Sequence, residues 1–178
     1  MSTEPIITPD FVWPEPDANG DRTLANGAVI GQYAVIGQDA TIGQYARIEQ
    51  YARIEQDAVI GQYARIERHA TIGQSAVIER HARIGQGAVI GRDAVIGQGA
   101  RVGPNARWIA CVGFADGHYK DLCAVGDVAY IGAGCRWFTL GEALRHWGDH
   151  EEDRQDTLDL MQAAVAIAKR RGLKLEKA

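Results

Sequence analysis

The sequence lacks long apolar runs, and it lacks a large excess of either charge. No stretch of its 178 residues is long and apolar enough to span a bilayer, and the N-terminus has no basic and then apolar signal segment. A formal net charge of −4 gives neither a basic field for nucleic acid nor an acidic field that mimics it. The sequence therefore predicts a cytoplasmic protein that binds neither nucleic acid nor membranes.

Cysteine is also scarce. Cys111, Cys123 and Cys135 are evenly spaced, and an odd count in an intracellular chain favours free thiols. Even spacing would also allow the thiols to gather with His118 as a metal site. There is no Cys-x-x-Cys pair, however, so small buried core residues are the preferred interpretation. We expect no metal and no cofactor.

What the sequence does contain is a run of thirteen consecutive hexapeptides over residues 28–105. Each has Ala first and an aliphatic residue third, then Gly or Glu, a polar residue and a turn residue. Side chains two positions apart point to the same face of a strand, so Ala and the aliphatic residue share an inner face. The aliphatic residues are Ile30, Ile36, Ile42, Ile48, Ile54, Ile60, Ile66, Ile72, Ile78, Ile84, Ile90, Ile96 and Val102.

A six-residue period predicts a solenoid, because a flat sheet of such short strands would not bury this many Ile side chains. Three hexapeptides would close a triangular coil, and successive coils would stack as parallel strands about 4.8 Å apart. The sixth position carries residue types that tolerate a left-handed backbone conformation, together with four Tyr. Glu replaces the Gly after the aliphatic residue at four places, so that Gly relieves crowding rather than supplying a positive φ.

The pattern resembles the hexapeptide-repeat family of left-handed parallel β-helices, for example in Ala58-Val59-Ile60-Gly61-Gln62-Tyr63. The resemblance implies a left-handed solenoid over residues 22–107. The left hand comes from the resemblance alone, since general rules favour right-handed crossovers.

The two ends depart from the repeat. Residues 1–21 are predicted to form an irregular N-terminal cap, in which Phe11, Val12 and Trp13 plug the first coil. Residues 108–178 are predicted to form a small α+β domain, with a β-meander over 108–138 whose three strands are expected at 108–114, about 120–125 and 128–138. Helices are expected over about 139–147, opened by a Thr139 and Glu142 capping box, and over about 150–171.

The C-terminal tail resembles that of uncharacterised phage and prophage proteins. The resemblance rests on Gly134-Cys135-Arg136-Trp137-Phe138-Thr139-Leu140 and on Trp147-Gly148-Asp149. It implies a phage or prophage origin, with a location in the host cytoplasm or the virion.

The best-known hexapeptide-repeat proteins are acyltransferases. Resemblance to them implies a trimer that binds acyl-CoA between neighbouring prisms and uses a His as general base. His69 and His81 are the histidines of the repeat. Those enzymes usually interrupt the repeat with a loop that closes the site, and this repeat has no insertion. A γ-class carbonic anhydrase is disfavoured, because its three zinc-binding His do not match this spacing.

The corner aromatics predict two columns, Tyr33, Tyr51, His69 and Tyr45, Tyr63, His81, which stack for stability or present an aromatic edge to a partner. The outward Arg47, Arg65, Arg83 and Arg101 predict a third column. Arg followed two residues later by Glu (at 47, 53 and 65) favours charge neutralisation along the strands. Arg83 and Arg101 lack such a local Glu and are therefore the better candidates for binding an anionic partner.

Taken together, these patterns favour a non-enzymatic, homo-oligomeric scaffold or protein-binding module, of phage or prophage origin, acting as a structural protein or as an inhibitor of a host protein. A trimer is expected, with its contact surface on the flat row of Thr41, Val59, Val77 and Val95. The alternative is an acyltransferase that uses acyl-CoA, with His69 and His81 as the candidate catalytic residues.

Overall fold

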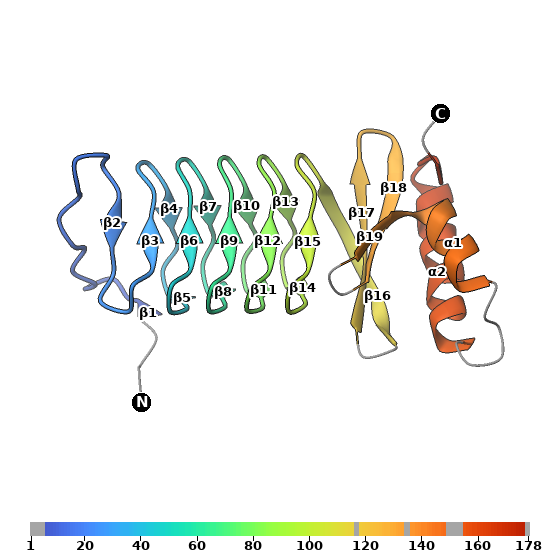
Figure 1. Cartoon of the computed structure of the whole chain (residues 1–178), viewed down its shortest axis with the longest axis horizontal. Coiled ribbons are helices and arrows are strands. Elements are labelled where there is room, and N and C mark those ends of the chain that lie inside the picture. The colour runs from blue at the N-terminus through green and yellow to red at the C-terminus, as the bar shows by residue number, and fades with distance from the viewer. Residues whose placement is uncertain (1–5, 116–117, 134–135, 149–154, 177–178) are drawn as a thin grey trace.

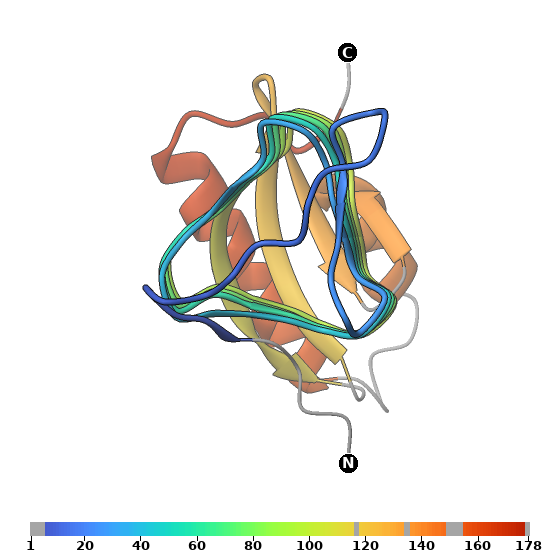
Figure 2. The same ribbon diagram turned by 90° about the vertical axis from the view of Figure 1, so that its left-hand side faces the viewer.

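The computed structural model describes residues 6–115, 118–133, 136–148 and 155–176. Between the two ends the chain winds into a stack of triangular coils whose short strands form three parallel sheets, seen from the side in Figure 1 and end-on in Figure 2. We name the three sides of this prism face A, face B and face C. The left-handed parallel β-helix expected from the repeat is confirmed.

The strands divide among the faces as the period of three hexapeptides requires. Face A contains β1 (Ile6–Ile7), β5 (Ala40–Ile42), β8 (Val59–Ile60), β11 (Val77–Ile78) and β14 (Val95–Ile96). Face B contains β2 (Arg22–Thr23), β3 (Val29–Ile30), β6 (Arg47–Ile48), β9 (Arg65–Ile66), β12 (Arg83–Ile84) and β15 (Arg101–Val102). Face C begins with β4 (Val35–Ile36), β7 (Arg53–Ile54), β10 (Thr71–Ile72) and β13 (Val89–Ile90).

The core of the prism is a column of Ile from each face, with Ala filling the space between. From Ile42 to Ile96 these side chains are almost completely buried, as are the intervening Ala residues. Burying one such aliphatic side chain contributes about 1.5–3 kcal/mol. Ile36 lies in the first coil and is only half-buried, because a single neighbouring coil covers it.

The corners adopt the backbone conformation that the residue types predict. Positive φ angles occur at the sixth position throughout, for example 59° at Tyr51 and at Asp57 and 60° at His81. The Gly after each aliphatic residue has a different role, as expected. A Cβ on Gly31 would lie 2.6 Å from the backbone N of Gln50 in the next coil, so close stacking requires Gly at that position.

The N-terminal cap contains regular structure where an irregular segment was expected. β1 pairs antiparallel with β5, and β2 pairs antiparallel with β3, so two of the three sheets gain a strand at this end. Phe11 and Trp13 pack edge to face against each other and against the first-coil core. Val12 is 87% exposed and does not belong to the plug.

At the C-terminal end, face C continues as an antiparallel meander. β13 pairs in parallel with β16 (Arg107–Ala115), and β17 (His118–Val125), β18 (Val128–Ala133) and β19 (Arg136–Thr139) follow in antiparallel order. The expected strand over residues 128–138 is thus wrong as a single element, since it consists of β18 and β19. Trp108 and Val125 pack on the last coil and close the core.

Two helices cover the meander on the side away from the solenoid (Figure 1). They are α1 (Leu140–Gly148) and α2 (Gln155–Arg170), and the first part of the expected second helix, residues 150–154, lies outside the described residues. The capping box is confirmed, because Thr139 N–H donates to Glu142 at 2.8 Å and Glu142 N–H donates to the Thr139 hydroxyl at 3.2 Å. Within the described segments, neither helix is long and apolar enough to cross a membrane.

Candidate functional site

The predicted aromatic columns exist and stack ring on ring. Tyr51 lies 5.1 Å from Tyr33 and 5.2 Å from His69 between ring centroids, with planes within 21° of parallel. In the second column Tyr63 lies 5.3 Å from Tyr45 and 5.2 Å from His81. All four Tyr rings are about half exposed. Stacking at this distance stabilises the coils and leaves the ring edges accessible.

The two histidines lie on different corners of the prism. His69 ends the column between faces B and C, whereas His81 ends the column between faces A and B. The structure therefore does not bring the two together into one site. The third corner, between faces C and A, carries an acidic column made of Asp39, Asp57, Ser75 and Asp93.

Face A presents the row expected to be the oligomer contact. Thr41 pairs directly with Val59, Val59 with Val77, and Val77 with Val95. All four side chains are half-buried in the single chain. The row is flat and mainly apolar, and its role as a contact surface stays a prediction.

Face B carries a ladder of charges whose pairing differs from the expectation. Arg65 forms an ion pair with Glu49 of the preceding coil, and Arg83 with Glu67, at a sequence separation of 16. Arg83 has no Glu in its own strand, as the sequence indicated, but it pairs with Glu67 because the side chains lean between adjacent coils. Among the pairs expected within one strand, the described residues show only Arg53 with Glu55, at 3.6 Å.

The Glu carboxylates of the ladder also satisfy backbone donors. Residues at the bend donate a backbone N–H to the Glu that lies 19 residues earlier, as in Gln86 to Glu67 at 3.1 Å and Gln74 to Glu55 at 3.2 Å. Although partial burial by itself raises the pKa of Glu67, the bonds from Arg83 and the Gln86 N–H hold it below its usual value. The Glu67 carboxylate is thus held as an anion.

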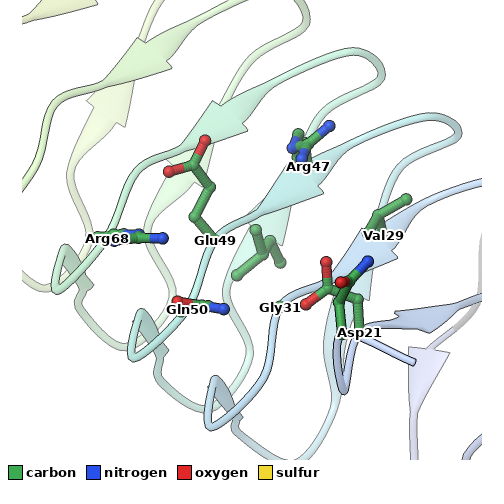
Figure 3. A pocket seen from close by; sticks show the side chains of 9 residues that line it. Asp21, Val29, Gly31, Arg47, Glu49, Gln50 and Arg68 are labelled. Carbon is green, nitrogen blue, oxygen red and sulfur yellow. The ribbon is translucent and has the colours of Figure 1, made fainter. Parts of the chain in front are cut away.

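Surface hollows occur on faces B and C where Gly takes the place of Glu. One of about 280 Å³ surrounds Gly31 and is lined by Arg47, Glu49, Gln50, Arg68 and Asp21, among others (Figure 3). Another of about 350 Å³ lies beside Gly85 and Gly103, below Arg101. Sequence reasoning identified Arg101 as a candidate but missed Arg47 and Arg68. Each paired Arg of the ladder contacts the Glu that lies 16 residues earlier. The residue 16 positions before Arg47 is Gly31, so this separation would have identified Arg47 as an Arg without a Glu partner in the ladder.

The junction between solenoid and meander buries two charged residues that sequence reasoning also missed. Asp121 is almost completely buried, and burial raises its pKa to about 7, although the Trp108 indole N–H 3.4 Å away acts in the opposite direction. Lys120 is buried on the opposite face of β17, where Nζ donates to Ala115 O at 2.8 Å and lies 5.8 Å from the centre of the Trp147 ring.

The cysteine cluster that the even spacing would allow falls mostly outside the described side chains. Cys123 is completely buried in β17, which fits a core role. The side chains of Cys111 and Cys135 are not among those described, and neither is that of His118. Within the described part of the chain, no three His, Cys, Asp or Glu side chains come together as a metal site.

Comparison with known proteins identifies the repeats. Residues 75–107 match the family model described as bacterial transferase hexapeptide (six repeats). No curated protein matches the chain.

Three solved structures with a similar fold are acetyltransferases by description. A serine acetyltransferase in complex with CoA is 22% identical, with 47% of this chain and 37% of that chain covered and a TM-score of 0.43. GDP-perosamine N-acetyl transferase from Caulobacter crescentus, in complex with CoA and GDP-perosamine, is 23% identical, with 47% and 42% covered and a TM-score of 0.42. An acetyltransferase by assignment from Bacillus cereus is 18% identical, with 85% and 92% covered and a TM-score of 0.28. The chain spans less than half the length of the first two.

These findings correct the functional expectation. The non-enzymatic scaffold or protein-binding module is wrong as the main interpretation, because residues 75–107 match a family model of bacterial transferases. Hexapeptide-repeat transferases are typically trimers, which supports the expected homo-oligomer. The resemblance of the tail to phage proteins stays a prediction.

Proposed function

Because the chain belongs to the hexapeptide-repeat family of left-handed parallel β-helices, we propose that it is an acyltransferase that takes its acyl group from acyl-CoA. The observation that carries the proposal is the match of residues 75–107 to the bacterial transferase hexapeptide model. That segment contains His81, which stands at an exposed corner and stacks on Tyr63 with the two rings 2° from parallel.

The protein acts as a homotrimer whose protomers meet through face A. The row of Thr41, Val59, Val77 and Val95 supports this choice, since it is apolar, flat and continuous over four coils. In a cyclic trimer each contact is heterologous, so the corner on one side of face A meets the corner on the other side of the neighbour's face A. This arrangement brings the His81 corner of one protomer towards the acidic corner of the next.

His81 is then the general base of the reaction. Its imidazole accepts the proton of an acceptor hydroxyl or amine while the acceptor oxygen or nitrogen attacks the thioester carbonyl. The carbon–sulfur bond breaks, the acyl group passes to the acceptor, and CoA leaves as the thiol after protonation. Asp57 and Asp93 of the acidic corner supply a negative charge that favours the imidazolium formed in this step. His69 lies on the corner that does not border face A, so it takes no part.

A matched pair of variants tests this assignment. His81→Asn and His69→Asn each keep a residue type that tolerates the positive φ of a corner, so the coils stay intact. CoA release from acetyl-CoA is followed with a thiol reagent in the presence of a panel of amine and hydroxyl acceptors. We expect His81→Asn to lower kcat/KM by about 10²–10⁴-fold. The His69→Asn variant should retain the wild-type value.

Binding of the donor is measured separately by thermal melting with millimolar acetyl-CoA, since a ligand that binds only the folded state raises the melting temperature. The proposal fails if acetyl-CoA neither shifts the melting temperature nor releases CoA with any acceptor. The choice of base is wrong if His69→Asn loses activity and His81→Asn does not.

A further inference from the structure

Glu67 shows how this solenoid holds a carboxylate. One carboxylate oxygen accepts from Arg83 Nε at 2.7 Å, and the other accepts from the backbone N–H of Gln86 at 3.1 Å. The two donors follow Glu67 by 16 and 19 residues, so both come from the coil above. One guanidinium and one backbone N–H thus form a two-point carboxylate site defined entirely by the register of the coils.

Two equivalent donors, an Arg and a backbone N–H, lie beside Gly31, which is one coil below Glu49 on face B. Arg47 follows Gly31 by 16 residues, as Arg83 follows Glu67. Gln50 follows Gly31 by 19 residues, as Gln86 follows Glu67. A Cβ on Gly31 would lie 2.6 Å from Gln50 N, so this nitrogen borders the space that a side chain at position 31 would enter. The chain places the donors there but supplies no carboxylate, because residue 31 has no side chain.

The charges around Gly31 leave the donors available. Within the residues that the structure describes, no ion pair or hydrogen bond engages the guanidinium group of Arg47, that of Arg68 or the Gln50 N–H. The acids of the hollow are engaged elsewhere, since Asp21 accepts from the Gln32 N–H at 3.0 Å and Glu49 pairs with Arg65. Figure 3 shows Arg47, Gln50 and Arg68 around the hollow, with Asp21 at its lower edge.

Five other glycines at the same position do not reproduce this set of donors. Gly85 faces Arg101, but the position of the backbone donor is Pro104, which has no N–H. Gly37 faces Arg53 and the Gln56 N–H, but Arg53 pairs with Glu55. Gly43, Gly61 and Gly73 face a Val in place of the Arg.

We propose that the hollow at Gly31 binds the carboxylate group of a small molecule, with Arg47 and the Gln50 N–H each taking one oxygen and Arg68 adding positive charge. The volume of about 280 Å³ admits a small carboxylic acid. At Glu67 the two equivalent donors each bind one oxygen of a planar carboxylate. We therefore prefer a carboxylate over phosphate as the ligand at Gly31. The inference does not depend on the proposed acyltransferase activity, because it rests on face B alone.

The test follows backbone amide signals of the isotope-labelled, full-length protein by transverse-relaxation-optimised NMR. Sodium acetate is the probe, sodium phosphate is the comparison, and sodium chloride at matched ionic strength is the control. We expect acetate to move the Gln50 amide signal along a saturable curve, and chloride to leave it in place. Arg47→Gln should weaken this binding by at least about tenfold, because it removes the charge-assisted hydrogen bond.

Arg101→Gln is the matched control, because it removes an exposed Arg from the same row of face B at a position without the backbone donor. This variant should bind acetate as the wild type does, and both variants should melt at the wild-type temperature. The proposal is overturned if the Gln50 amide signal does not move with acetate or moves equally with chloride. It is also overturned if the signal responds to acetate equally in Arg47→Gln. Tighter binding of phosphate than of acetate overturns the assignment to a carboxylate.

Discussion

Replacing the buried Asp121 by Asn should change how the stability of the protein depends on pH. Asp121 lies between the last coil and the meander, and its carboxylate accepts a hydrogen bond from the Trp108 indole N–H. Asn retains an oxygen acceptor for that contact but cannot ionise. The substitution thus separates the cost of burying a charge from the loss of the hydrogen bond.

The sign and size of the effect follow from the raised pKa. Burial lifts the pKa of Asp121 from 3.8 to about 7, so between these values the folded chain binds one proton more than the unfolded chain. The contribution of Asp121 to stability is therefore greatest below pH 3.8 and falls as pH rises towards 7, by up to about 1.4 kcal/mol per pH unit. A rise of the pKa by about 3 units corresponds to a total loss of at most about 4 kcal/mol in the free energy of unfolding.

Urea denaturation at fixed protein concentration, from pH 5 to pH 8, measures this dependence. We expect the free energy of unfolding of the wild type to fall over that range and that of Asp121→Asn to stay nearly level. Asp127→Asn is the matched control, because Asp127 is exposed and its hydrogen bond and ion pair with Lys174 lower its pKa, so it stays ionised throughout. Equal pH slopes for the wild type and Asp121→Asn would refute the reasoning.

Three further predictions concern the solenoid. Ile66→Ala should lower the free energy of unfolding by about 2–5 kcal/mol and Ile66→Val by about 0.5–1.5 kcal/mol, since the side chain is fully buried; equal losses in urea denaturation would contradict the packed core. Asp57→Val should lower the free energy of unfolding by about 1–3 kcal/mol, because residue 57 has a positive φ, whereas Asp57→Gly should lower it little. If thermal melting ranks the two variants the other way, backbone strain is not the cause. Val59→Arg combined with Val77→Arg should reduce the mass measured by light scattering from trimer to monomer, and an unchanged mass would sink the proposed contact through face A.

The solenoid could be predicted from the sequence because each of its structural requirements recurs in every hexapeptide. The inner Ile, the small Ala and the corner residues with positive φ each occupy one fixed position. A local pattern repeated thirteen times is hard to mistake, and the structure places all three where the pattern does. The inner residues Ala34, Ile36 and Ala100 depart from it, because they lie near the ends of the stack and are only partly buried.

The ion pairs could not be predicted by inspecting one strand at a time. Arg65 is two residues from Glu67 in sequence, yet it pairs with Glu49 in the coil below. Which carboxylate an Arg contacts depends on how its side chain leans between coils, and the local sequence does not contain that information. The same lean determines which donors surround Gly31.

The buried charges of β17 were missed for a different reason. Lys120 and Asp121 are adjacent, and consecutive charged residues in a short strand normally indicate an exposed edge. Here the strand is covered on both faces, by the last coil on one side and by the helices on the other, so both side chains are buried. This coverage depends on how the tail folds back, which no local pattern encodes.

The functional expectation failed because an uninterrupted repeat was taken as evidence against a transferase. The transferase family model matches residues 75–107, nearly all of which belong to that uninterrupted repeat. The absence of a loop in one chain carries little weight when neighbouring protomers can enclose a site.

The continuation of face C into the meander restricts how this chain can change in length. Partners in adjacent coils are 18 residues apart, so an insertion or deletion of one whole coil keeps every later strand on its own face. A change of a single hexapeptide would rotate everything that follows by a third of a turn (Figure 2) and would move the meander and its helices from face C to another side of the prism. Variation in the length of the solenoid is therefore expected in steps of whole coils, even though the sequence repeats in smaller units.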